Sequence, residues 1–173
     1  MQGQEYLQKE ALVRKWLEDV LRDDLKADLS EALASGIALC HVMLKLDQTL
    51  IPSIHYAGEN TAYKYRENLE FFVQAMEEYG VPQQKCFHPS DLTRQRNMPK
   101  VITSLIELAR LAETKNFRVV LPPEDSIPLV DRETLSDTHK KLLLKVCAPT
   151  LISIMFNTVP TNILTSLNVV LYY

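Results

Sequence analysis

The chain has 173 residues, of which 46% are hydrophobic and 24% are charged. This is enough for one globular domain with a buried central helix, followed by a further segment. Nineteen basic residues against 22 acidic ones give a formal charge of -3. No overall charge therefore directs the protein to nucleic acid or to an anionic membrane, and any basic binding surface must be local.

The cysteines, the glycines and the N-terminal residues indicate the cellular compartment and the fold class. The three cysteines, Cys40, Cys86 and Cys147, lie far apart and form no C-x-x-C pair. The polar N-terminus MQGQEYLQKE lacks the apolar core of a secretory signal. We therefore expect a cytoplasmic protein with free thiols. Because the chain holds only four glycines and little β-branched alternation before its last third, we expect an all-α fold.

The first predicted helix covers residues 10–23, EALVRKWLEDVLRD. Its apolar residues, among them Trp16, recur three and four positions apart, which is typical of an amphipathic helix. The same periodicity leaves Arg14, Lys15 and Arg22 on the outer face. A helix of this kind covers one side of a core.

The second predicted helix covers residues 28–46 and begins at Asp28, a residue type suited to the N-cap. It is apolar on most of its circumference, which predicts neighbours on several sides. We therefore expect it to be the central core helix. Gly36, next to small residues, would let another element approach closely.

The middle of the chain is predicted to be a long connection followed by a third main helix. Residues 47–66 have no clean helical period and contain Pro52 and Gly58. The stretch 67–80 places its apolar residues on one face and ends at Gly80, which suits a helix C-terminus.

The stretch DLTRQRNMPKVITSLIEL is predicted to hold a short turn and then the last main helix. Asp91 would cap the turn, and Leu92 would fill the core behind it. Asn97 or Met98 would cap the helix, because Pro99 is tolerated in a first turn. The helix should end near residue 113, with Leu105 and Ile106 buried.

The C-terminal third is divided into a proline-containing linker, residues 116–135, and an extension of unassigned fold, residues 136–173. The extension allows one helix capped at Ser136. Pro149 and Pro160 interrupt its apolar part, so we expect no membrane span. It could be part of a following region, a segment docked on the helical domain, or a dimer contact. Docking on the helical domain or on a partner chain is favoured because exposed apolar surface of this extent would aggregate.

The order of the motifs resembles the calponin-homology (CH) domain over about residues 9–115, and we assign residues 1–115 to that domain. The resemblance is to the single type, most like the N-terminal domain of IQGAP-type scaffolds or of Vav-like Rho exchange factors. It predicts four main helices plus short connecting helices. The matching residues are Trp16-Leu17-Glu18, Leu33 through Cys40, Asn68 through Phe72, Gly80-Val81-Pro82, and Asp91, Leu92, Asn97 and Val101.

The resemblance implies a non-enzymatic module that binds F-actin or another cytoskeletal protein. The competing implication is a regulatory, autoinhibitory domain that binds other domains of its own chain in a Rho guanine nucleotide exchange factor. Microtubule binding is a third, weaker alternative. Six motif residues are assigned structural rather than ligand-binding roles: Trp16, Gly36, Asn68, Asp91, Leu92 and Asn97.

Candidate binding residues are basic side chains that could meet an acidic filament surface. No catalytic residue is predicted, because the acidic pairs Asp23-Asp24 and Glu77-Glu78 are expected to be solvated at helix ends. No metal or cofactor is predicted either, because the histidines lack metal-ligand spacing and no glycine-rich nucleotide motif is present. The candidate residues for actin or partner binding are Arg14, Lys15, Arg22, Lys64, Arg66, Arg94, Arg96 and Lys100.

Overall fold

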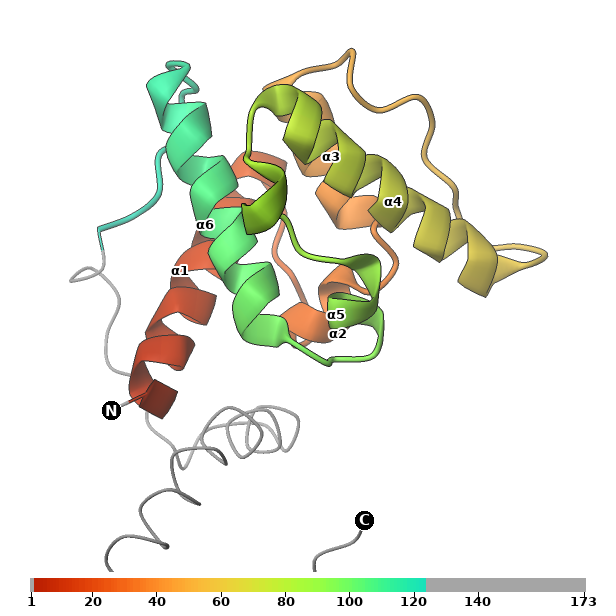
Figure 1. Cartoon of the computed structure of the whole chain (residues 1–173), viewed down its shortest axis with the longest axis horizontal. Coiled ribbons are helices and arrows are strands. Elements are labelled where there is room, and N and C mark those ends of the chain that lie inside the picture. Colours follow the sequence, from red (N-terminus) through yellow and green to blue (C-terminus); the bar gives the residue numbers. More distant parts are fainter. Residues whose placement is uncertain (1, 124–173) are drawn as a thin grey trace, which may run out of the picture.

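The computed structural model describes residues 2–123, and this part of the chain is helical with no strand. It confirms the expected all-α fold (Figure 1). The elements in order are α1 (Gln2–Leu21), α2 (Leu29–Leu33), α3 (Ile37–Leu46), α4 (Thr61–Tyr79), the 3-10 helix η1 (Gln83–Lys85), α5 (Pro89–Thr93) and α6 (Met98–Thr114).

Four long helices build the core. Helices α1 and α6 lie side by side, α3 packs against both α1 and α4, and the short helices α2 and α5 close one end (Figure 1). The faces that meet are those with apolar periodicity, and Trp16 and Phe72 are fully buried between them. The predicted burial of Leu105 and Ile106 is confirmed, because both belong to this core.

The predicted helix over residues 28–46 is in fact two helices, α2 and α3. Asp28 does precede the first of them, but its side chain does not cap α2. The break lies at Gly36, whose φ of +70° is in the left-handed region. A Cβ atom on Gly36 would lie 2.8 Å from Cβ of Asn68, so the expected close approach of another element is confirmed, and that element is α4.

Two helices begin earlier than the apolar periodicity predicted. Helix α1 begins at Gln2 instead of residue 10, and α4 begins at Thr61 instead of residue 67. At the start of α4, the Thr61 hydroxyl donates to the Gly58 carbonyl at 2.5 Å and accepts the Gly58 N–H at 3.1 Å. These two bonds fix the first turn without any buried side chain, which is why no apolar pattern marked it.

The first residues of the predicted linker pack on the helical domain. Phe117, Val119 and Leu121 lie against the core, and the Trp16 indole N–H donates to the Val119 carbonyl at 3.3 Å. The Lys115 ammonium lies 3.7 Å from the centre of the Tyr79 ring. Residues 124–173, which include the rest of the linker and the whole predicted extension, lie outside the described residues.

Candidate functional site

The motif residue Asn68 ties α4 to the segments on either side of α3. Its side-chain amide accepts the His55 N–H at 2.8 Å and donates to the carbonyls of Ser35 at 3.0 Å and His55 at 2.8 Å. Asn68 is fully buried. The structural role expected for Asn68 is therefore one of buried hydrogen bonding, and no part of this side chain is available to a ligand.

Helix α5 is capped differently from the prediction. The N-cap residue is His88, whose ring Nδ1 accepts the Ser90 N–H at 3.2 Å. Asp91 is the third residue of the helix, and its carboxylate accepts the His88 N–H at 2.9 Å. The cap prediction for Asp91 is wrong in position, although the predicted core role of Leu92 is confirmed. A capping residue followed by proline and then by an acid three positions later was the signal for His88.

The connection between α5 and α6, residues 94–97, is a tight and well-anchored turn, which we call the α5–α6 turn. Gln95 has a φ of +48°, and its side-chain amide donates to the Ser30 hydroxyl at 3.2 Å. Asn97 caps α6 by accepting the Lys100 N–H at 3.2 Å, as predicted. The turn is thus held at both ends by hydrogen bonds and beneath by the buried Leu92.

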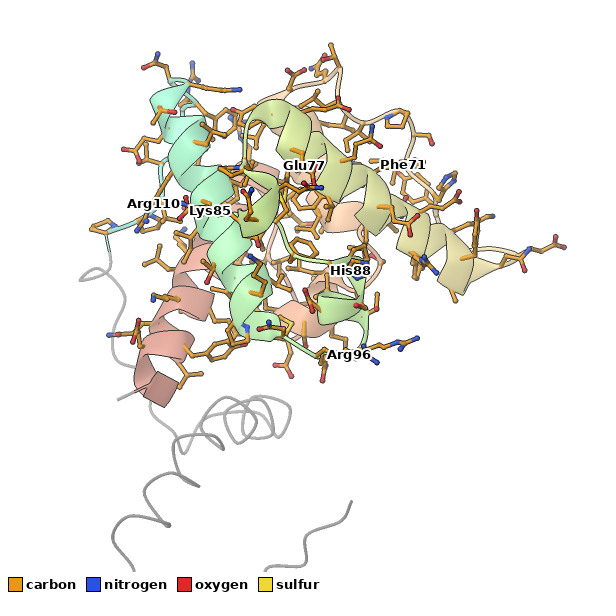
Figure 2. All side chains as sticks on the ribbon, in the orientation of Figure 1. Phe71, Glu77, Lys85, His88, Arg96 and Arg110 are labelled. Atoms are coloured by element: carbon orange, nitrogen blue, oxygen red, sulfur yellow. The ribbon has the colours of Figure 1, made fainter. Side chains whose placement is uncertain are left out.

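Arg94 and Arg96 project from this turn. Both residues are exposed, and within residues 2–123 neither guanidinium has a hydrogen bond or an ion pair. Figure 2 shows Arg96 just below α5, in the connection that leads to α6. Arg94 and Arg96 therefore present their full charge to solvent from a fixed backbone.

Lys100 lies nearby but is differently engaged. Its ammonium donates to the Gln84 carbonyl in η1, and the neighbouring Ser104 hydroxyl donates to the Lys85 carbonyl at 2.5 Å. Lys85 itself pairs with Glu107 at 2.8 Å. Lys100 therefore fastens η1 to α6, and its charge is only partly open to a partner.

Arg14 does not point to water as the helical periodicity predicted. Its guanidinium donates to the carbonyls of Leu25 and Ala27, both at 2.6 Å, and lies 3.5 Å from the Glu18 carboxylate. The side chain is only 26% exposed. Arg14 holds the connection between α1 and α2 in place, so the prediction that it lies on a free outer face is wrong.

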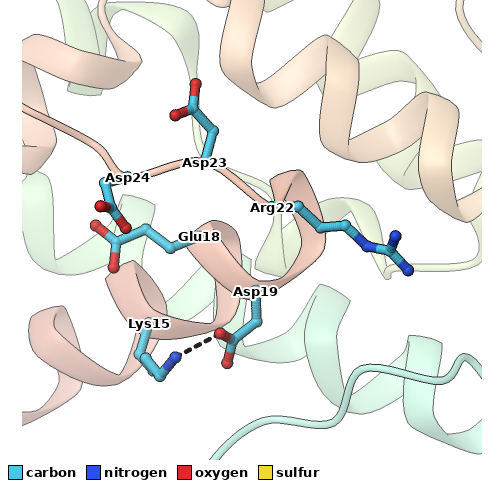
Figure 3. A pocket seen from close by; sticks show the side chains of 6 residues that line it. All are labelled: Lys15, Glu18, Asp19, Arg22, Asp23 and Asp24. Carbon is cyan, nitrogen blue, oxygen red and sulfur yellow. Dashed lines mark hydrogen bonds and ion pairs between the residues drawn. The ribbon is translucent and has the colours of Figure 1, made fainter.

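Two more candidate residues, Lys15 in α1 and Arg22 directly after it, border an acidic hollow of about 380 Å³ (Figure 3). Lys15 is exposed but paired with Asp19. Figure 3 shows Arg22 pointing away from the nearby carboxylates. The hollow has two basic side chains against four carboxylates, so this face attracts a basic partner better than an acidic one. Its lining residues are Lys15, Glu18, Asp19, Arg22, Asp23 and Asp24.

Lys64 and Arg66 lie within α4 rather than before it. Arg66 is exposed but pairs with Glu70 at 2.8 Å, and Lys64 is half-buried beside Gly58. The first turn of α4 and the α5–α6 turn lie in different parts of the molecule (Figure 1). The structure therefore separates the eight candidate residues instead of gathering them into one site.

Residues 2–123 contain neither a candidate metal site nor a candidate membrane-spanning helix. No group of three or more histidine, cysteine, aspartate or glutamate side chains is arranged to hold a metal ion there. No helix in the same range has the length and hydropathy to cross a membrane.

Comparison with known proteins places this geometry in a family. Residues 7–114 match the family model of the calponin homology (CH) domain. Calponin-2 from Sus scrofa is 36% identical over 111 residues, or 64% of this chain and 37% of calponin-2, and calponin-2 from Homo sapiens is 35% identical over the same length. The chain thus spans little more than a third of the length of these relatives.

Solved structures agree on the fold. The calponin-homology domain of Rng2 from Schizosaccharomyces pombe superposes with a TM-score of 0.66 at 21% identity, covering 86% of this chain and 91% of that one. A structure described as the calponin-homology domain of an IQGAP protein from the same organism gives the same values. The expected resemblance is confirmed, and the chain belongs to the calponin-homology domain family.

Proposed function

We propose that this domain is a non-enzymatic, cytoplasmic module that binds F-actin or a similarly acidic cytoskeletal filament through the α5–α6 turn. Membership in the calponin-homology family supports a cytoskeletal interaction module in general. Arg94 and Arg96 would supply charge attraction, and no covalent step, metal or cofactor is involved.

The observation that carries this proposal is the contrast among the basic clusters. Arg94 and Arg96 are exposed and have no partner within the described residues. Arg14, Lys15 and Arg66 are engaged by carbonyls or carboxylates. Arg22 is also exposed and unpaired within the described residues, but it borders the acidic hollow, whose four carboxylates would repel an acidic partner. An unpaired guanidinium on a fixed turn loses no existing interaction and little backbone freedom when it binds a carboxylate. The α5–α6 turn is therefore the best-prepared site for an acidic partner.

Charge reversal with a matched control tests this site. The double variant Arg94→Glu/Arg96→Glu should weaken co-sedimentation with F-actin by tenfold or more, while the thermal midpoint changes little because both side chains are exposed. The control Arg110→Glu/Arg118→Glu makes the same change in net charge at exposed positions elsewhere. Equal loss of binding in both variants would show that net charge matters and that the turn does not.

A regulatory function is the second candidate. It is supported by the return of the chain to the domain, where residues 117–121 pack on the core and Val119 accepts a bond from Trp16. In this case the domain would bind other parts of its own chain, such as a catalytic region acting on a Rho GTPase. The charge reversals above would then leave actin binding unaffected and raise nucleotide exchange in the full-length protein.

A further inference from the structure

The connection between α3 and α4 carries a tyrosine that the proposed function does not use. Residues 51–56 have no helix, strand or turn, and Tyr56 lies at the end of this stretch with 58% of its surface exposed. The Tyr56 hydroxyl lies 3.4 Å from Nε2 of His41 on α3. Tyr56 is thus an exposed phenol on irregular backbone beside a basic side chain.

Tyr56 differs from every other tyrosine in residues 2–123. Tyr6 and Tyr79 are buried. Tyr63 is 64% exposed and Tyr65 is half-buried, but both belong to α4, whose first turn is fixed by the bonds between Thr61 and Gly58. Within this range, only Tyr56 combines exposure with a backbone outside regular secondary structure.

This combination is what a tyrosine kinase needs. A kinase binds its substrate segment in an extended conformation, so a tyrosine in a helix must first be unwound, at a cost of several backbone hydrogen bonds. Residues 52, 53 and 56–60 are exposed, while the bonds of Asn68 to the His55 backbone hold the segment on the surface. We propose that Tyr56 is a phosphorylation site for a protein tyrosine kinase.

The reaction needs MgATP and the kinase. The Tyr56 hydroxyl oxygen forms a new bond to the γ-phosphorus of ATP, while the bond from that phosphorus to the β,γ-bridging oxygen breaks. ADP leaves with the electron pair, and the hydroxyl proton passes to the catalytic base of the kinase. The phosphate on Tyr56 then carries a charge of about -1.5 to -2 at neutral pH.

Helix α3 offers a place for the new phosphate. His41 lies next to the hydroxyl, and Lys45 is one helical turn further along the same face. Both residues also line a groove of about 430 Å³, so space is open in front of them. A phosphate on Tyr56 would pair with these two side chains and fasten the connection between α3 and α4 to α3.

The rate of phosphorylation at each tyrosine tests the site. The full chain is incubated with the catalytic domain of a non-receptor tyrosine kinase and MgATP, and each site is quantified by peptide mass spectrometry. Tyr56 should be modified at least tenfold faster than Tyr63, and Tyr56→Phe should abolish that signal whereas Tyr63→Phe should not. Equal or faster modification of Tyr63 would overturn the proposal.

A peptide of residues 50–69 separates structure from sequence preference, because it contains Tyr56 and Tyr63, together with Tyr65, without the folded domain. The ratio of the two rates should fall toward one in this peptide. An unchanged tenfold ratio would mean that local sequence, and not the fold, selects Tyr56, and would contradict the argument.

The rate of dephosphorylation tests whether His41 and Lys45 hold the phosphate on Tyr56. The phosphorylated variant His41→Gln/Lys45→Gln should lose its phosphate to a tyrosine phosphatase several times faster than the phosphorylated wild-type chain. A Lys64→Gln control, on α4, should not change that rate. Identical rates in all three proteins would show that α3 does not hold the phosphate.

Discussion

Replacing Asn68 with alanine should destabilise the domain more than replacing any exposed motif residue with alanine. The substitution removes three hydrogen bonds that join α4 to the Ser35 carbonyl and to both backbone groups of His55. Each such bond contributes about 1 kcal/mol net. Because Ser35 and His55 are half-buried and their freed backbone groups can reach water, we expect a total loss of about 3 kcal/mol.

Equilibrium unfolding in urea measures this loss. Trp16 is the only tryptophan of the chain and is fully buried, so its fluorescence reports the core directly. The matched control is Asn97→Ala, which removes one bond at an exposed helix cap and should cost about 1 kcal/mol. If Asn68→Ala costs no more than Asn97→Ala, the buried network does not hold the helices together and the reasoning is refuted.

Three further predictions concern stability. Leu105→Ala should cost about 2–5 kcal/mol in the same urea assay, because Leu105 is fully buried, and a loss below about 0.5 kcal/mol would contradict this burial. Burial raises the pKa of the Cys40 thiol from 9.0 to about 12, so above pH 9 the folded state binds more protons than the unfolded state and stability should fall. Cys40→Ala should reduce that fall, and an identical pH dependence would exclude Cys40 as a contributor. Thermal melts with and without chelator should coincide, because we expect folding to need no metal, and a large downward shift with chelator would contradict this.

The sequence predicts that a helix is present wherever that helix packs one apolar face against the core. The periodic residues around Trp16, Phe72 and Leu105 marked α1, α4 and α6 correctly. The N-cap of α6 was predictable too, because Asn97 and Pro99 give a local signal that needs no tertiary context.

Features that depend on tertiary contacts escaped prediction. The break at Gly36 left no mark, because α2 and α3 both face the core and their apolar residues form one uninterrupted pattern. The missed part of α1, residues 2–9, has only two apolar residues, Tyr6 and Leu7, which are adjacent and buried, and the first turn of α4 has no buried side chain, so neither stretch shows a repeating apolar pattern. The sequence identified the residues that could bind an acidic partner but not their neighbours, and Arg14 meets the Leu25 and Ala27 carbonyls only because the chain turns back after α1.

The central claim is that this domain alone binds an acidic filament through exposed charge. Co-sedimentation of the wild-type chain with F-actin, measured as salt is raised from about 20 to 150 mM, tests it most directly. We predict clear pelleting at low salt that weakens steadily as salt rises, because exposed charges are screened over about 8–10 Å at physiological ionic strength. Failure to pellet with F-actin at any salt concentration would contradict the claim and leave the regulatory function as the better account.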